Sequence, residues 1–227
     1  MNIKEIVKKS KKGVFIDLKP NNNELIISFG GVGGTWLMPP FEFFNTTRSL
    51  NKNKLFFRDI KQTWYHQGIK EIGPTINDIA LYINNFIKIN QIKDVTTVGT
   101  SAGGYAALLF GFLCKVNRVH AFSPQSIIGK NKHIPLKYQW FIDPYNSFLD
   151  KKYIDLKDIF KNNSNNKSEL YIHTGTGNKR DGYQANRLSG IKNVNINFYK
   201  TNAHNVAKYL RDKGMLKKII TNKTNNL

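Results

Sequence analysis

Short apolar runs, rich in β-branched and aromatic residues, recur along the whole chain and are separated by segments rich in Asn, Gly, Pro and Lys. Such runs, bounded by turn-forming residues, are typical of β-strands that are buried in a sheet. The pattern predicts strands at Val14–Asp17, Glu24–Phe29, Lys54–Arg58, Asp94–Val98, Arg118–Phe122, Leu170–His173 and Val194–Tyr199.

Helical spacing of apolar residues appears between the later strands. Strands that alternate with helices predict an α/β fold, with a mostly parallel sheet and helices on both faces. The first two strands are an exception, because the turn-rich segment Lys19–Asn23 between them favours a leading hairpin. The helical patterns cover roughly Thr75–Ile89, Ala102–Cys114, Gly182–Leu188 and Asn205–Lys213.

Two segments fit this alternation poorly. Residues 123–152 contain three prolines and several aromatic residues, and we expect a small cap insertion there. Asn162–Asn166 is polar and of low complexity, which indicates an exposed loop. No internal repeat and no linker divides the chain, so residues 1–227 are expected to form one domain.

The chain is strongly basic, with 35 Lys and Arg against 15 Asp and Glu and a net charge of +20. Such a field favours anionic partners, including acidic glycans, acidic lipids and the phosphates of a coenzyme. The lysines are scattered and no nucleic-acid-binding module is recognisable, so we expect no specific nucleic-acid partner. Part of the excess charge also fits a composition bias on solvated faces.

Targeting signals and cofactor signals are weak. The N-terminal residues 1–12 are charged and lack the apolar segment of a signal peptide, and no run of about 18 apolar residues predicts a membrane span. We therefore expect a cytoplasmic protein, and peripheral association with a membrane surface stays open.

The single Cys114 excludes an intramolecular disulfide and is interpreted as part of the core. We expect no metal.

The strongest chemical signal is Gly99–Gly104, which reads GTSAGG between a predicted buried strand and an Ala/Leu-rich helix. G-x-S-x-G in this context predicts a nucleophile elbow, in which a strained turn exposes the serine. Small flanking residues are needed there, and Gly99, Ala102 and Gly103 meet that need. Ser101 is therefore the candidate nucleophile, and a structural serine in a Gly-rich turn is the alternative.

A serine nucleophile requires a base. Among the five histidines, His204 follows the last predicted strand and precedes an apolar helix, which is where the chain order Ser, acid, His places the base. A surface histidine that caps this helix is the alternative.

The acid is expected after the penultimate strand. Asp181 is the one carboxylate between Glu169 and Asp212, so chain order selects it. It could instead cap the helix that follows. Asp143, in the cap segment, is the reserve candidate.

An oxyanion hole would use the backbone N–H of Ala102 and a second N–H from the loop after an earlier strand. The Gly-rich stretch 28–34 follows the strand Glu24–Phe29, and we expect Phe29 or Gly30 to be the donor, within one or two residues. A phosphate-binding loop is the rival interpretation. Against it, neither the Lys-Ser/Thr of a P-loop nor the start of a helix follows.

The segment 56–68 is dense in functional residue types and follows the third predicted strand, whose carboxyl end faces the ligand edge of an α/β sheet. Arg58, Trp64, Tyr65 and His66 are candidates for binding a polar, glycan-like substrate. Equally, Trp64 and Tyr65 could only pack this loop onto the sheet.

Together, the elbow, the late aspartate and the histidine of the last loop resemble the α/β-hydrolase superfamily over nearly the whole chain. Three features also resemble bacterial capsule-polysaccharide O-acetyltransferases of this fold. The resemblance implies acetyl transfer from acetyl-CoA to a sugar hydroxyl through Ser101, Asp181 and His204. Gly31 and Gln125 are further substrate-binding candidates. The Gly-rich loop and residues 58–68 do not match that family. The three features are Gly99–Gly104 with its helix, Ser123-Pro124-Gln125, and Asp181-Gly182-Tyr183 continuing to Asn186 and Leu188.

Three functions remain open from the sequence. The first is O-acetylation of an anionic, capsule-type bacterial surface polysaccharide or its precursor, with acetyl-CoA as donor. The second is an esterase or deacetylase that uses the same triad. The third is a non-catalytic partner in glycan assembly or export. The basic charge favours the transferase, since both the donor and the acceptor would be anionic.

Overall fold

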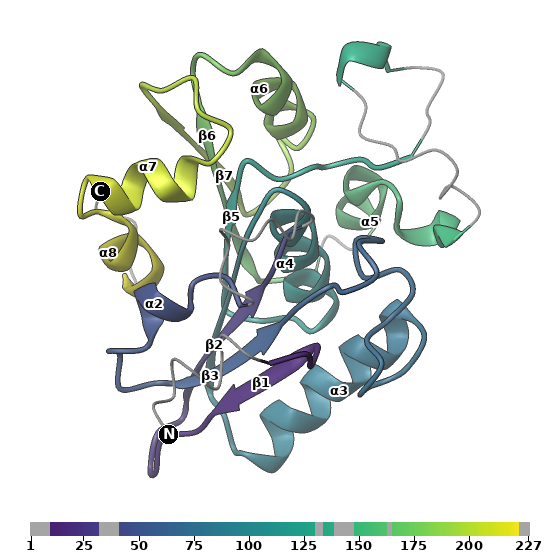
Figure 1. The fold of residues 1–227 in the computed structure, drawn as a ribbon. Helices are drawn as coiled ribbons and strands as arrows, with labels where there is room; N and C mark the ends of the chain where they lie inside the picture. Colours follow the sequence, from purple (N-terminus) through teal and green to yellow (C-terminus); the bar gives the residue numbers. More distant parts are fainter. Residues whose placement is uncertain (1–9, 32–40, 130–133, 139–147, 163–164, 223–227) are drawn as a thin grey trace.

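The computed structural model describes residues 10–31, 41–129, 134–138, 148–162 and 165–222 (Figure 1). Within them, a seven-stranded sheet has the strand order β1-β3-β2-β4-β5-β6-β7. The strands are β1 (Val14–Asp17), β2 (Glu24–Phe29), β3 (Asn53–Phe57), β4 (Asp94–Thr100), β5 (Arg118–Phe122), β6 (Glu169–Gly175) and β7 (Val194–Tyr199).

Strands β2 to β7 run parallel to their neighbours, and β1 is antiparallel to β3. The expected hairpin of β1 and β2 is therefore wrong, because β3 lies between these strands. The observed pairing brings the ring of Phe15 within 5.9 Å of that of Phe56. It also places the carboxylate of Asp17 3.1 Å from the fully buried ammonium group of Lys54. A buried charge requires such a partner, and a local hairpin would not supply it.

Helices cover both faces of the sheet, as the sequence predicted (Figure 1). One core contains Leu25, Ile27 and Phe29 of β2, whereas Ile26 belongs to the core on the opposite face, as the two-residue period of a strand requires. The first face is covered by four helices: α3 (Ile76–Ile89), α4 (Ala102–Leu113), α5 (Leu156–Lys161) and α6 (Lys179–Asn186). The second face is covered by α2 (Phe44–Thr47), α7 (Val206–Asp212) and α8 (Leu216–Thr221). The short helices α2, α5 and α8 are too brief to show a period in the sequence.

Helix α4 is the central helix of the first face. Almost every residue from Ala102 to Phe112 is buried, so the helix is apolar on all sides, as a core helix is. It contacts β2, β4 and β5. Because α4 begins directly after β4, its first turn lies at the carboxyl ends of the parallel strands, where ligand sites of α/β sheets form.

The expected cap segment leaves the sheet between β5 and β6. Its described part includes the 3-10 turns η1 (Leu136–Tyr138) and, at its end, η3 (Lys151–Tyr153). The ring of Tyr138 stacks on that of Tyr183 at 4.4 Å, and Gln184 Nε2 donates a 2.7 Å hydrogen bond to the carbonyl of Tyr138. The segment is thus attached to α6. Asp143, the reserve acid, lies outside the described residues.

Candidate active site

Ser101 forms the sharp turn between β4 and α4. Its backbone has φ 57° and ψ −118°, a conformation that costs a non-glycine residue about 1–3 kcal/mol. Its N–H donates to the carbonyl of Phe122 at 2.9 Å, which ties the turn to β5. A methyl group on Gly99 would lie 2.0 Å from the carbonyl oxygen of Gly103, so only glycine fits at position 99. The motif therefore forms the strained elbow that its sequence predicts.

His204 and Asp181 lie in line with Ser101. The Oγ of Ser101 is 3.0 Å from Nε2 of His204, and Nδ1 of His204 is 2.8 Å from Oδ2 of Asp181. Because a carboxylate only accepts hydrogen bonds, Nδ1 carries a proton, which leaves Nε2 of the neutral ring as the acceptor facing Ser101. This is the geometry that a base needs in order to take the proton of a serine.

The alternative capping roles of these two residues belong to their neighbours. Asn178 caps α6, since its Oδ1 accepts the N–H of Asp181 at 3.1 Å. Asn205 caps α7, since its Oδ1 accepts the N–H of Lys208 at 2.8 Å. Asp181 and His204 therefore do not cap these helices; the carboxylate of Asp181 contacts His204, whose ring faces Ser101.

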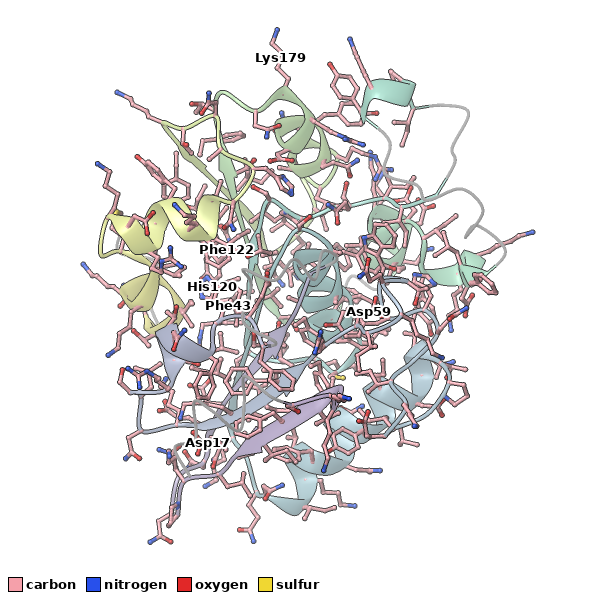
Figure 2. The ribbon with its side chains drawn as sticks, viewed as in Figure 1. Asp17, Phe43, Asp59, His120, Phe122 and Lys179 are labelled. Carbon is pink, nitrogen blue, oxygen red and sulfur yellow. The ribbon has the colours of Figure 1, made fainter. Side chains whose placement is uncertain are left out.

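The other described histidines lie elsewhere. His120 and His173 are buried against each other in the sheet, with Nδ1 of His120 3.1 Å from Nε2 of His173. Burial lowers the pKa of His120 to about 3 and also lowers that of His173, so both are neutral. Figure 2 labels His120 and Phe122, which both belong to β5, whereas Lys179 projects outward from the start of α6. His133 lies outside the described residues.

The first expected oxyanion donor, Ala102, occupies the first position of α4, where helix N–H groups have no partner within the helix. The two residues expected to supply the second donor are both engaged in the sheet. The N–H of Gly30 donates to the carbonyl of Phe57 at 2.9 Å and is used by the sheet, while Phe29 lies within β2 between β3 and β4. Backbone hydrogen bonding to β3 thus extends one residue past the end of β2, to Gly30. Gly31 is the next described residue of this loop, and Val32–Gly34 lie outside the description.

Glu42 is a residue of this site that the sequence reasoning missed. The backbone N–H groups of Gly31 and Thr100 donate toward its carboxylate, yet burial dominates and raises its pKa to about 7. Its Oε2 is buried without a hydrogen-bond partner. Together with Thr100, Asn205 and Lys208 it lines a small cavity of about 100 Å³ next to the triad. The signal in the sequence that could have identified Glu42 is its position as the single carboxylate within the aromatic run Phe41–Phe44.

Of the four candidates in 56–68, Trp64 is the one linked to Ser101. Its Nε1–H donates to Oε1 of Gln125 at 3.1 Å, and Nε2 of Gln125 donates to Oγ of Ser101 at 2.9 Å. The hydroxyl of the fully buried Tyr65 instead donates to the carbonyl of Gly30 at 2.9 Å.

His66 and Arg58 also have partners within the protein. Nδ1 of His66 accepts the N–H of Asp150, and its Nε2 lies 2.9 Å from the hydroxyl of Tyr105. Arg58 turns toward the carbonyl of Ser10 at 3.5 Å. These contacts are internal to the protein, and a role of either side chain in substrate binding stays a prediction.

Three further observations on the described residues concern metal binding, membrane-spanning helices and the single cysteine. No group of three or more His, Cys, Asp or Glu side chains there could hold a metal ion. No helix in the same part of the chain is long and apolar enough to cross a membrane. Burial raises the pKa of Cys114 to about 12, so its thiol is protonated at neutral pH. The side chain is partly buried and packs against the core.

The fold has clear counterparts among solved structures. The capsule O-acetyltransferase of Neisseria meningitidis serogroup A superposes with a TM-score of 0.68 at 18% identity, covering 92% of this chain and 90% of that chain. A lipase-esterase related protein from Clostridium acetobutylicum superposes with a TM-score of 0.56 at 16% identity, covering 92% and 98%. The chain has the α/β-hydrolase fold.

A mutant of the same Neisseria enzyme, solved in complex with CoA, shares this α/β-hydrolase fold, with a TM-score of 0.63 at 16% identity, covering 94% of this chain and 99% of that chain. No protein-family model and no curated protein matches the sequence. At such low identities the likeness establishes the fold, and the chemistry must be argued from the residues.

Proposed function

We propose that this chain is a serine-dependent acyltransferase that acetylates hydroxyl groups of an anionic bacterial surface polysaccharide or its precursor, with acetyl-CoA as donor. The observation that supports it most is the continuous hydrogen-bonded series from Asp181 through His204 to Ser101 at a strained elbow. Such a series activates a serine for attack on an acyl group.

In the first half-reaction, Oγ of Ser101 attacks the carbonyl carbon of the acetyl thioester while Nε2 of His204 takes the hydroxyl proton. Asp181 keeps the proton on Nδ1 and stabilises the imidazolium that forms. The N–H of Ala102 faces the developing oxyanion at the start of α4. The carbon–sulfur bond then breaks, the CoA sulfur leaves with the proton held by His204, and Ser101 carries the acetyl group.

In the second half-reaction, a sugar hydroxyl gives its proton to His204 and attacks the acetyl-serine. The ester bond to Ser101 breaks and its Oγ regains the proton. Water at the same position would make the protein an esterase, which is the second candidate function. The likeness to the Clostridium lipase-esterase related protein favours that candidate.

Two observations favour transfer over hydrolysis. The net charge of +20 suits a donor with phosphates and an anionic acceptor. The closer superposition is with an O-acetyltransferase, which was also solved in complex with CoA. The hydrogen-bonded triad argues against a non-catalytic partner, because such proteins are expected to lose a member of the triad.

The test is incubation with acetyl-CoA and with an aryl acetate, with and without anionic glycan acceptors, followed by intact-mass and peptide analysis. We expect an acetyl group on Ser101 and acceptor-dependent turnover of acetyl-CoA. Ser101→Ala should reduce the rate by about 10⁴- to 10⁶-fold with little change in stability. Acetyl-Ser101 that is consumed equally fast without any acceptor would favour the esterase. Activity of Ser101→Ala above a few per cent would overturn the assignment.

A further inference from the structure

Gln125 is a partner of the candidate nucleophile that the triad does not include. Its side-chain amide bridges the Nε1 of Trp64, at 3.1 Å, and the Oγ of Ser101, at 2.9 Å. The indole N–H only donates, so the amide oxygen must face Trp64. The amide NH₂ of Gln125 therefore faces Ser101, and this orientation follows from chemistry.

The bridge is held rigidly. Gln125 and Trp64 are both buried. Trp64 and Tyr65 have φ of 53° and 65°, two consecutive non-glycine residues in the left-handed region. Each such residue is strained and persists only where its surroundings hold it. The surroundings here include Oδ2 of Asp59, which accepts the N–H of Tyr65 at 3.0 Å.

The hydrogen bond from Gln125 limits which lone pair of Ser101 Oγ is available for attack. This Oγ carries one hydrogen and two lone pairs. The hydrogen faces Nε2 of His204, and one lone pair accepts the N–H of Gln125, which leaves the second lone pair to attack an acyl carbon. We infer that Gln125 is a catalytic residue that sets the direction of the nucleophile, and that Trp64 is a positioning residue that acts through it. This inference rests on the proposed role of Ser101.

The same N–H has a role when the acyl group leaves. As the bond from the acyl carbon to Oγ breaks, its electron pair moves to Oγ, and Nε2 of His204 supplies the proton. A donor on Oγ stabilises the charge that develops before this transfer is complete. Hydrogen bonds to charged groups are stronger than neutral ones. Gln125 thus assists both formation and breakdown of the acyl-serine.

The test measures the rate at which Ser101 reacts with a fluorophosphonate and with an aryl acetate. Gln125→Met has similar length and cannot donate, so we expect a rate about 10- to 100-fold lower. Trp64→Phe keeps the aromatic packing but frees the amide to turn, and we expect a loss of about 2- to 10-fold. In the Gln125→Met background, Trp64→Phe should cause no further loss, because its effect passes through Gln125.

The double variant, which combines Gln125→Met with Trp64→Phe, distinguishes an effect on the reaction rate from an effect on stability. Gln125→Met alone leaves a buried indole N–H without a partner, whereas the double variant replaces both partners by apolar groups and should recover thermal stability. Its rate should nevertheless stay as low as that of Gln125→Met. Recovery of the rate along with stability would show a structural role and overturn the inference. Tyr105→Phe, which removes a buried hydroxyl bonded to the carbonyl of Tyr153, is the matched control and should leave the rate unchanged.

The reagents also keep the two proposals apart. A wild-type chain that reacts with the fluorophosphonate at Ser101 but does not use acetyl-CoA would overturn the transferase proposal alone, and the variants would still decide the role of Gln125. Wild-type and Gln125→Met chains that react at equal rates would overturn the inference alone. A Ser101 inert to both reagents would overturn both.

Discussion

Oδ2 of Asp181 lies 2.8 Å from Nδ1 of His204, and Oδ1 of the same carboxylate lies 3.0 Å from that nitrogen. The side chain of Asp181 is only 2% exposed, whereas that of His204 is 37% exposed. The acid is thus shielded from solvent behind the imidazole, which strengthens its electrostatic effect on the ring. The exposed side of the ring remains accessible to a substrate.

This relationship predicts the effect of Asp181→Asn. The amide preserves the shape but can donate to Nδ1, which would turn the imidazole to the tautomer that cannot accept from Ser101. We expect kcat to fall on the order of 10⁴-fold. Asp212→Asn removes an exposed carboxylate from α7 and serves as control. Equal activity of the two variants in an aryl acetate assay would contradict the role of Asp181.

The close approach of Gly103 to the chain of Phe29 predicts a steric effect. A methyl group at position 103 would lie 2.3 Å from the carbonyl oxygen of Phe29, whereas one at Gly182 would meet nothing within 4 Å. Gly103→Ala should lower the free energy of unfolding by about 1–3 kcal/mol. Gly182→Ala, within α6, should raise it by up to about 1 kcal/mol. Urea unfolding of both variants checks this pair, and equal stabilities would contradict it.

Glu42 predicts a dependence of stability on pH. Its pKa in the folded chain is about 7, above the ordinary value of 4.5, so the folded state binds the proton more tightly than the unfolded state. The contribution of Glu42 to stability is therefore greatest below about pH 4.5 and decreases as the pH rises through 7. Above pH 7, Glu42→Gln should be more stable than the wild type by at most about 3 kcal/mol.

Urea unfolding between pH 4.5 and 8 checks this expectation. Glu42→Gln should flatten the slope of stability against pH, whereas Glu169→Gln, which removes an exposed carboxylate of β6, should leave the slope as it is. Parallel slopes for the wild type and Glu42→Gln would show that the carboxyl does not titrate in this range.

The net charge predicts a dependence of binding on salt. If the charge of +20 serves an anionic donor or acceptor, the KM for acetyl-CoA or a charged glycan should rise steeply with salt. The screening length falls from about 8 Å at physiological ionic strength to about 3 Å at 1 M. Turnover of a neutral aryl ester should change little. An equal response of charged and neutral substrates would move the esterase ahead of the transferase.

Single lysines can localise this effect. Lys179 projects outward at the start of α6, two residues before Asp181 (Figure 2). Lys179→Gln should raise the KM for acetyl-CoA and weaken its salt dependence, whereas Lys88→Gln, at the far end of α3, should not. Arg180 is a second position to neutralise. Lys130 and Lys132, in the expected cap segment, lie outside the described residues.

The sequence by itself determined the strands, the mostly parallel α/β arrangement and the three residues that meet at the elbow. Buried parallel strands appear as continuous apolar runs, so β2 and β5 have the bounds that their runs predict. The elbow could also be identified from the sequence, because its strained turn admits only small neighbours of Ser101. Chain order then selected Asp181, which follows the penultimate strand, and His204, which follows the last strand.

Only the tertiary structure decided which distant groups complete this arrangement. The pairing of β1 with β3 places Asp17 beside the buried ammonium group of Lys54, and no local pattern encodes this contact. The contact of Gln125 with Ser101 depends on Trp64, which is 61 residues away from Gln125 in the chain. Hydrophobic periodicity records which side of an element is buried. It does not record which buried polar groups satisfy one another, because that depends on side-chain positions that only packing sets.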